Sequence, residues 1–147
     1  MAETANMSEG KCYEDLEIGM SHETHHKITE EDIIKFADVS GDYNPLHMDE
    51  EYASKTAFGQ RIAHGALTAS FISAILGNHL PGPGAIFVGL SMRFRRPVFI
   101  GSDVTVRAEV AEMNPRGNRV TLKVDCVVDG KRVISGEAQV VVPGREG

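Results

Sequence analysis

The sequence contains no tryptophan and only two cysteines, Cys12 and Cys126, which lie far apart in the chain. A disulfide framework or a cysteine-based zinc site needs several cysteines at short, paired spacings, so neither is expected. An excess of positive charge is also missing, since the formal net charge is −6. Because binding to a phosphate backbone requires clustered positive charge, the composition argues against a general nucleic-acid-binding protein.

Long hydrophobic runs are absent as well. The longest one, GALTASFISAILG at 65–77, is too short to cross a bilayer and contains hydroxyl groups. The first residues, MAETANMSEGK, lack the apolar core of a signal peptide. These features predict a cytoplasmic protein with reduced cysteines and no membrane partner.

The composition that remains is typical of a globular protein, with 41% hydrophobic and 24% charged residues. A chain of 147 residues is long enough to bury most of its apolar surface in one core. The first residues are polar and are expected to fray. We therefore expect a flexible N-terminus at 1–12 and a single domain over 13–143.

Helix signals dominate the first half of the chain. Thr29 is expected to cap a helix in which Ile33 and Phe36 recur at helical spacing. Ser40-Gly41 supplies the end of this helix. A further helical turn or two is expected within 48–58, where acidic residues come early and favour the helix dipole.

A second helix is predicted to begin after His64-Gly65 and to end near Gly77-Asn78. Its apolar residues leave almost no polar face. A surface helix would carry a polar stripe, so this helix is expected to be buried on most sides.

The second half of the chain changes from helical spacing to the alternation of β-strands. Asp129-Gly130 is a hairpin signal, and Gly136 marks a bulge or a close approach of another chain segment. The expected strands are 85–98, 103–113, 118–128 and 131–142, with further short-strand and turn character at 13–29. No helical crossover separates the strands, so a parallel sheet is disfavoured. The pattern predicts an α+β fold in which an antiparallel sheet wraps around a central apolar helix.

An acid/base pair lies astride a proline in SGDYNPLHMDEEYA, residues 40–53. In a regular helix, the five residues from Asp42 to His47 would rotate the two side chains about 140° apart. Pro45 disfavours a helix through Asn44. We therefore expect a loop that folds back and lets Asp42 and His47 converge, although Asp, Asn and Pro are also ordinary turn residues.

Three stretches together resemble the MaoC-like branch of the hot-dog fold, and within it the (R)-specific 2-enoyl-CoA hydratases: DYNPLH (42–47), FGQRIAHGALTASFIS (58–73) and VGLSMRFRRPVFIGSDVTV (88–106). The resemblance covers roughly 13–143. It implies a lyase that reversibly hydrates trans-2-enoyl-CoA to (R)-3-hydroxyacyl-CoA, in fatty acid metabolism and polyhydroxyalkanoate precursor supply. It also implies a homodimer. No separate cofactor is implied, because coenzyme A is part of the substrate.

The resemblance implies that Asp42 and His47 are the catalytic dyad, which adds water and a proton to the same face of the double bond. Positioned acid/base groups of this kind are worth roughly 10²–10⁴ in rate. Gly65 is expected to provide an oxyanion donor through its backbone N–H. Free N–H groups at a helix N-terminus favour developing negative charge, although glycine is also common where a helix packs closely on a sheet.

Three residues are expected to support the site. Asn44 and His64 are expected to fix the loop and the helix entry. Ser73 matches a serine that the family uses at the active site, and its ordinary role would be a hydrogen bond to a helical carbonyl.

Coenzyme A carries phosphates, so an acidic protein needs a local basic patch to bind it. The candidates are Arg93, Arg95 and Arg96, which could equally line a solvated strand face. A competing cluster is formed by His22, His25 and His26. No acid or cysteine completes a standard zinc spacing there, so no metal site is expected.

Three other functions remain open from the sequence. An acyl-thioester hydrolase or an acyl-carrier-protein dehydratase could share the same fold. A non-catalytic acyl-binding or dimerisation module would have no need of a dyad. The acyl-chain length, the carrier and the identity of the base within the Asp42/His47 pair are not determined by the sequence.

Overall fold

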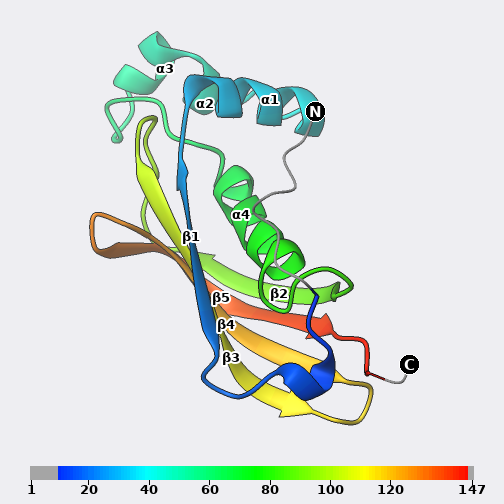
Figure 1. Ribbon diagram of the computed structural model, residues 1–147. Coiled ribbons are helices and arrows are strands. Elements are labelled where there is room, and N and C mark those ends of the chain that lie inside the picture. Colours follow the sequence, from blue (N-terminus) through cyan, green and yellow to red (C-terminus); the bar gives the residue numbers. More distant parts are fainter. Residues whose placement is uncertain (1–9, 146–147) are drawn as a thin grey trace.

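The computed structural model describes residues 10–145, so residues 1–9 of the segment expected to be flexible lie outside the described part. Five strands form one antiparallel sheet (Figure 1). They are β1 (Ser21–Lys27), β2 (Ile86–Phe94), β3 (Asp103–Asn114), β4 (Arg119–Val128) and β5 (Lys131–Val141). A short 3-10 helix, Tyr13–Asp15, precedes them.

The strands are ordered β1-β3-β4-β5-β2 across the sheet. Strands β3, β4 and β5 pair in sequence order, whereas β2 crosses to the far edge and pairs with β5. Strand β1 forms the other edge of the sheet and pairs with β3. The strand alternation therefore predicted the elements correctly, but it did not specify that β2 is separated from β3.

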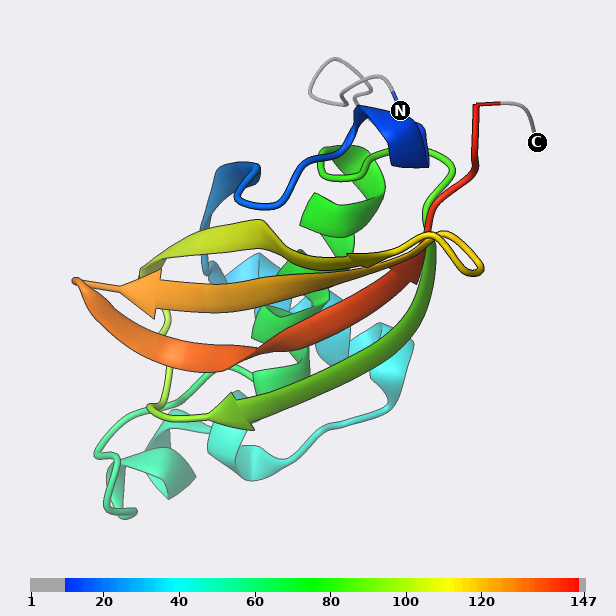
Figure 2. The same cartoon turned by 90° about the horizontal axis from the view of Figure 1, so that it is seen from below.

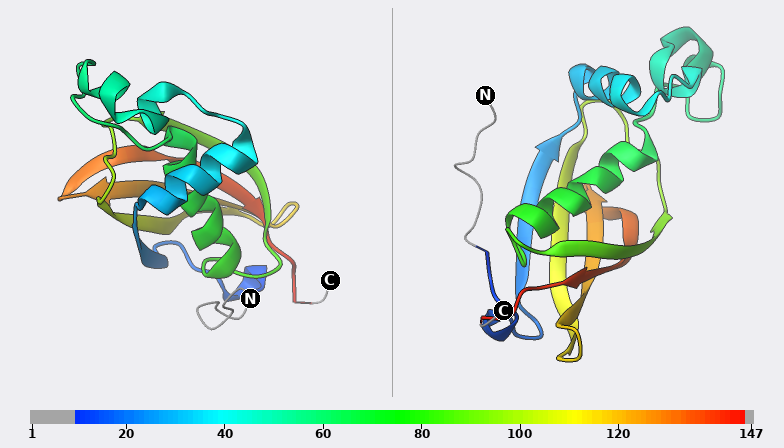
Figure 3. Two further views of the ribbon diagram at one scale, coloured as in Figure 1. Left: turned by 90° about the horizontal axis from the view of Figure 1, so that it is seen from above. Right: turned by 90° about the vertical axis from the view of Figure 1, so that its right-hand side faces the viewer.

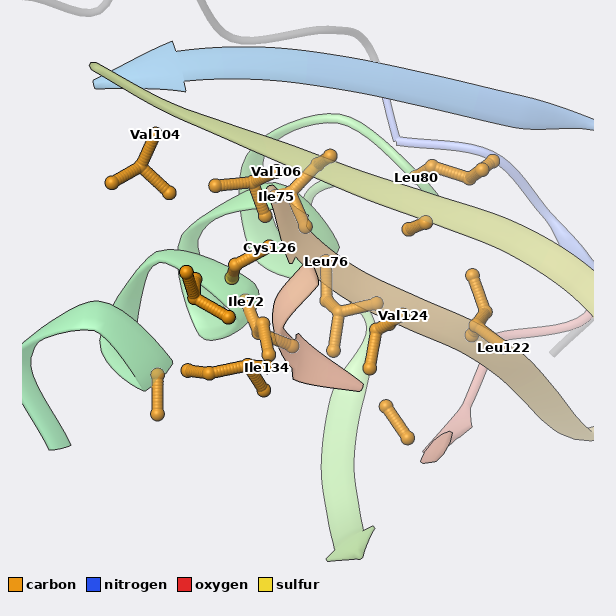
Figure 4. Close-up of a cluster of buried hydrophobic side chains, with 14 of the residues drawn as sticks. Ile72, Ile75, Leu76, Leu80, Val104, Val106, Leu122, Val124, Cys126 and Ile134 are labelled. Carbon is orange, nitrogen blue, oxygen red and sulfur yellow. The ribbon is translucent and has the colours of Figure 1, made fainter. Parts of the chain in front are cut away.

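Helix α4 (Gly65–Asn78) lies across the concave face of this sheet (Figures 2 and 3). Its residues Ile72, Ile75 and Leu76 lie among side chains of β3, β4 and β5 (Figure 4). The alternating residues of β3 and β4 that were expected on one face are all buried: Val104, Val106, Ala108, Val110, Val120, Leu122, Val124 and Cys126. The predicted sheet wrapped around a central apolar helix is confirmed.

The expectation that α4 is buried on most sides is confirmed, because its buried residues cover more than half of the helix circumference and a single stripe is exposed. Ala66, Ser70, Ser73 and Ala74 are exposed on the side that faces away from the sheet. The five-stranded sheet does not cover this stripe, which carries small residues. Within residues 10–145, no helix is long and apolar enough to span a membrane.

Three further helices form a cap at one end of the sheet, near the start of α4 (Figures 1 and 3). They are α1 (Glu30–Ser40), α2 (Pro45–Met48) and α3 (Glu50–Ser54). Thr29 and Asp32 form a reciprocal capping box at the start of α1, and Gly41 ends this helix with a φ of 79°. Both predicted ends of α1 and the helical turn within 48–58 are confirmed.

Gly136 lies at a close approach between β5 and β2. A Cβ atom at this position would lie 2.8 Å from the Met92 Cα and still closer to the Ser91 carbonyl oxygen. The β2–β5 register is regular at this point, so the close approach is confirmed and the bulge is not.

Replacing Gly136 with alanine should lower the free energy of unfolding by about 1–3 kcal/mol, because the main chain of β2 must move to make room. Urea unfolding measures this change. Gly89→Ala on β2 is the matched control, since the nearest atoms there belong to the Gln139 side chain at 3.5 Å. Equal effects of the two substitutions would contradict the packing argument.

Candidate active site

The loop between α1 and α2 is built from short polar side chains that bond to their own neighbourhood. The Ser40 hydroxyl accepts a hydrogen bond from the Asp42 N–H at 3.1 Å. The Asp42 carboxyl accepts from the Asn44 N–H at 3.1 Å, and the Asn44 side chain accepts from the Leu46 N–H at 3.0 Å. These bonds fix Asp42 in an exposed turn that leads directly into α2.

The expectation that the chain is a loop through His47 was wrong in part. Pro45 begins the one-turn helix α2, and Asn44 is its N-cap. A proline suits the first helical position because the missing N–H is not needed there and φ is already helical. Asp42 lies before this helix, so the 140° rotation expected within a continuous helix does not separate it from His47.

His47 is largely buried, with 9% of its surface exposed. Its Nδ1–H donates a hydrogen bond to the Ile62 carbonyl oxygen at 2.8 Å. In the neutral ring, this bond leaves the Nε2 lone pair free to accept a proton. Burial lowers the pKa of His47, and the nearby His64 lowers it further, whereas the bond to Ile62 and the Asp42 carboxyl oppose the shift.

Asp42, His47 and His64 converge from different elements. One carboxyl oxygen of Asp42 and one ring nitrogen of each histidine lie within 4.8 Å of one another. The two imidazole rings have centroids 4.1 Å apart. His64 Nε2 also donates to the Asp42 backbone oxygen at 3.0 Å, so the buried His64 connects the Asp42 turn to the start of α4.

A cavity of about 290 Å³ lies beside this cluster. Its walls are mostly apolar and come from α2, the 58–63 segment, the first turn of α4, the end of β2 and β5. The lining residues are His47, Phe58, Ile62, Ala63, Gly65, Thr68, Phe94, Arg95, Arg96, Pro97, Val98 and Ile134. Asp42 is not among these lining residues, but one of its carboxyl oxygens lies within 4.8 Å of a ring nitrogen of His47, which does line the cavity.

Gly65 is the first residue of α4 and lines the cavity. The first N–H groups of a helix have no acceptor within it, so the Gly65 N–H is available to an oxygen in the cavity, whereas the Leu67 N–H already donates to the His64 carbonyl oxygen at 3.1 Å. A Cβ at Gly65 would lie 2.7 Å from the Phe94 ring. Glycine therefore lets the Phe94 ring pack directly against the start of α4 and leaves the backbone N–H open to a close approach.

The remaining candidates divide into those near the cavity and those away from it. Arg95 and Arg96 line the cavity, whereas Arg93 lines a separate shallow depression over β2 and β5. Ser73 is exposed on α4 and is not among the residues lining the cavity. Asn44 acts as a helix cap, which agrees with its expected supporting role in the loop.

The histidine cluster on β1 is placed elsewhere. His22 stacks on His79 with centroids 4.4 Å apart, and His26 stacks on Phe71 and lies 3.1 Å from the Asp32 carboxyl. They line a larger hollow of about 570 Å³ between β1 and α4. In residues 10–145, the donor atoms close enough to share a metal ion belong to Asp42, His47 and His64, not to this cluster.

Sequence reasoning missed Arg61, whose side chain is 11% exposed. Its Nη1 and Nη2 lie 2.5 and 2.7 Å from the two carboxyl oxygens of Glu30 on α1, and its Nε donates to the His47 backbone oxygen at 2.7 Å. The next residue, Ile62, accepts from the His47 ring. The pair Arg61–Ile62 thus holds His47 at two points, but Glu30 is 31 residues away in sequence and no local pattern signals this contact.

Comparisons with known proteins identify the family of this chain. The MaoC like domain family matches residues 15–134. An (R)-specific enoyl-CoA hydratase of Rhodospirillum rubrum is 50% identical over 90% of this chain and 92% of its own. A 3-hydroxybutyryl-CoA dehydratase of Methylorubrum extorquens is 46% identical over 91% of this chain and 85% of its own.

Among solved structures, the unliganded R-hydratase PhaJ1 of Pseudomonas aeruginosa superimposes with a TM-score of 0.88 at 43% identity, over 92% of this chain and 88% of that one. The fold, the converging side chains and the match over most of the chain all lead to one conclusion: the chain belongs to the MaoC-like family of hot-dog proteins.

Proposed function

We propose that this protein is a lyase that hydrates a trans-2-enoyl-CoA to the (R)-3-hydroxyacyl-CoA and catalyses the reverse dehydration. The observation that carries the proposal is that Asp42 approaches His47, and that His47 lines a mostly apolar cavity together with Gly65 at the N-terminus of α4. The names of relatives that match over about nine-tenths of this chain support the same reaction class.

Hydration needs a water whose oxygen bonds to C3 and whose proton reaches C2. The Asp42 carboxyl and the free Nε2 of His47 would hold this water between them. His47 is the better candidate for accepting the water proton, because its Nδ1 already donates to Ile62 and burial keeps the ring neutral. The same proton then passes to C2, so the enzyme regains its starting state.

The electron pair displaced from the double bond moves onto the thioester oxygen. Gly65 would stabilise this charge through its backbone N–H at the start of α4, a contribution worth on the order of 10²–10³ in kcat. The mostly apolar walls of the cavity lower the local dielectric and so strengthen the interaction. No separate cofactor takes part in this proposal.

Coenzyme A binding is proposed for Arg95 and Arg96, which line the cavity wall. Arg95 uses Nε to bond Ser135, and Arg96 uses Nη1 to bond the Arg132 carbonyl oxygen. A guanidinium has five N–H donors, so each retains donors for a phosphate. Arg93 lines a different depression and is the weaker candidate.

We also propose a homodimer in which β2 pairs with its counterpart. One edge of β2 is free of strand partners within the described chain, since β2 pairs only with β5. Phe87, Leu90 and Phe94 are exposed, although they pair with buried residues of β5 and therefore face the helix side of the sheet. A second copy would cover these side chains together with the small-residue side of α4. A cytoplasmic location is part of the same proposal.

Substitution of the dyad tests the reaction. Asp42→Ala and His47→Ala should each reduce kcat for crotonyl-CoA by about 10²–10⁴-fold with an intact fold, as measured by loss of the enoyl absorbance and by circular dichroism. Glu51→Gln, which removes an exposed carboxyl of α3 paired with Lys55, is the control and should keep full activity. Near-normal turnover by either dyad variant, or release of free thiol instead of enoyl consumption, would contradict the proposal.

The pH dependence follows from the lowered pKa of His47. Below that pKa the ring is protonated and cannot accept the water proton, so kcat/KM should stay constant at higher pH and fall as the pH drops through it. Because burial lowers this pKa, the midpoint of the acid limb should lie below that of an ordinary histidine. A midpoint at or above the ordinary value, measured in the pH–rate profile, would exclude the neutral His47 as proton acceptor.

Sedimentation tests the dimer. The wild type should sediment at about twice the chain mass of 16.0 kDa. Leu90→Lys should shift it to monomer, because a charge would be buried on the helix side of the β2 edge. Ser91→Lys, on the opposite face of the same strand, should leave the dimer intact. A Leu90→Lys protein that remains dimeric would place the interface elsewhere.

A further inference from the structure

Two polar atoms are left unpaired at the start of α4. Among the side chains of residues 10–145, the buried nitrogen and oxygen atoms without a hydrogen-bond partner are His64 Nδ1 and Thr68 Oγ1. Both side chains are almost fully buried, at 2% and 1% exposed. Buried polar groups are nearly always paired, because losing water without gaining a partner is costly. Two unpaired polar atoms within the first turns of one helix therefore indicate that a ligand or water binds near the start of α4.

The Thr68 hydroxyl differs from its neighbours in the same helix. A threonine inside a helix commonly satisfies its hydroxyl with a carbonyl one turn earlier. The carbonyl of His64 accepts the backbone N–H of Thr68 at 3.3 Å, but the hydroxyl bonds to no carbonyl. Ser70, two residues further on, shows the usual arrangement and donates to the Leu67 carbonyl oxygen at 2.6 Å.

Thr68 also lies in the right place to meet a substrate. It lines the cavity together with Gly65 and His47. Residues three apart in a helix share one face, so the Thr68 side chain follows Gly65 along the cavity wall. The other residue of α4 that lines this cavity is Gly65, which has no side-chain donor.

We propose that the Thr68 hydroxyl is a second donor to the thioester carbonyl oxygen, beside the Gly65 N–H. This rests on the proposed hydratase function. When the water oxygen bonds to C3, the π pair of the C2=C3 bond moves toward C1 and the carbonyl oxygen becomes negative. The hydroxyl donates a hydrogen bond to that oxygen until a proton reaches C2 and the C1=O bond is restored. Thr68 neither gains nor loses a proton, so the step balances without another reactant.

A structural rival is a buried water that bridges Thr68 Oγ1 and His64 Nδ1. The two explanations make opposite predictions for stability. A hydroxyl that waits for substrate is an unpaired buried group in the free enzyme, so its removal should not destabilise the fold and can stabilise it. A hydroxyl that holds a structural water is satisfied in the free enzyme, so its removal should lower the melting temperature.

The experiment compares Thr68→Val, which keeps the shape and removes the hydroxyl, with Thr68→Ser, which keeps the hydroxyl. Crotonyl-CoA turnover and the melting temperature are measured for each variant without substrate. Thr68→Val should reduce kcat by about 10²-fold with KM nearly unchanged, because the donor acts mainly on the charge that develops in the transition state. Its melting temperature should equal or exceed that of the wild type. Thr68→Ser should restore most of kcat.

Ser70→Ala is the matched control, since it removes a hydroxyl of the same helix that is already bonded internally. It should leave kcat unchanged. A wild-type kcat in Thr68→Val would overturn this inference and leave the proposed function standing. The same holds if Thr68→Val lowers the melting temperature and Thr68→Ser restores it while kcat is the same in both variants. A wild type that hydrates no enoyl-CoA would overturn the proposed function and this inference with it.

Discussion

The apolar side of α4 packs into the concave face of the sheet, where Ile72, Ile75 and Leu76 are removed from water almost completely. Each such side chain contributes roughly 1.5–3 kcal/mol when it is fully buried. This packing fixes the axis of the helix and therefore the position of its first turn. Gly65 and Thr68 meet the cavity only because the apolar residues further along the helix are anchored in the sheet.

The helical cap depends on a second link, the segment from Arg61 to Ala63. Ala63 donates its N–H to the Val98 carbonyl at 2.7 Å, which attaches the segment to the chain that follows β2. From the same segment, Arg61 and Ile62 hold the backbone and the ring of His47. The imidazole is thus fixed relative to α4 through the sheet, not through α2 alone. A one-turn helix has little stability of its own, so this external support sets the orientation of His47.

The site combines costly features that the rest of the described chain avoids. Its walls are apolar, and His64 and Thr68 carry buried polar atoms without partners. An apolar environment strengthens hydrogen bonds to a developing charge, but it also penalises every unpaired donor or acceptor in the free protein. The well-packed sheet and α4 supply the stability that allows such a site to exist. Burial also affects His47: it lowers the pKa of the ring and so favours the neutral form that can accept a proton.

The sequence by itself determined the elements and much of the chemistry, because these depend on neighbouring residues. Alternating apolar residues fixed β3 and β4, the Thr29 capping box fixed the start of α1, and the apolar run after Gly65 fixed α4. The D-x-N-P-x-H motif pointed to the family and to the residues that converge. The inference at Pro45 failed: this residue was expected to prevent a helix, but it occupies the first position of α2, where its missing N–H is not needed.

Only the tertiary structure decided which of these elements meet. The crossing of β2 to the far sheet edge, the contact between Arg61 and Glu30, and the placement of Arg95 and not Arg93 in the cavity wall each join residues distant in sequence. The exposure of one side of α4 is likewise decided by the tertiary structure, because the strands of the sheet do not cover that side of the helix. Periodicity states which face of an element is apolar, but the partner of that face is set by packing of the whole chain.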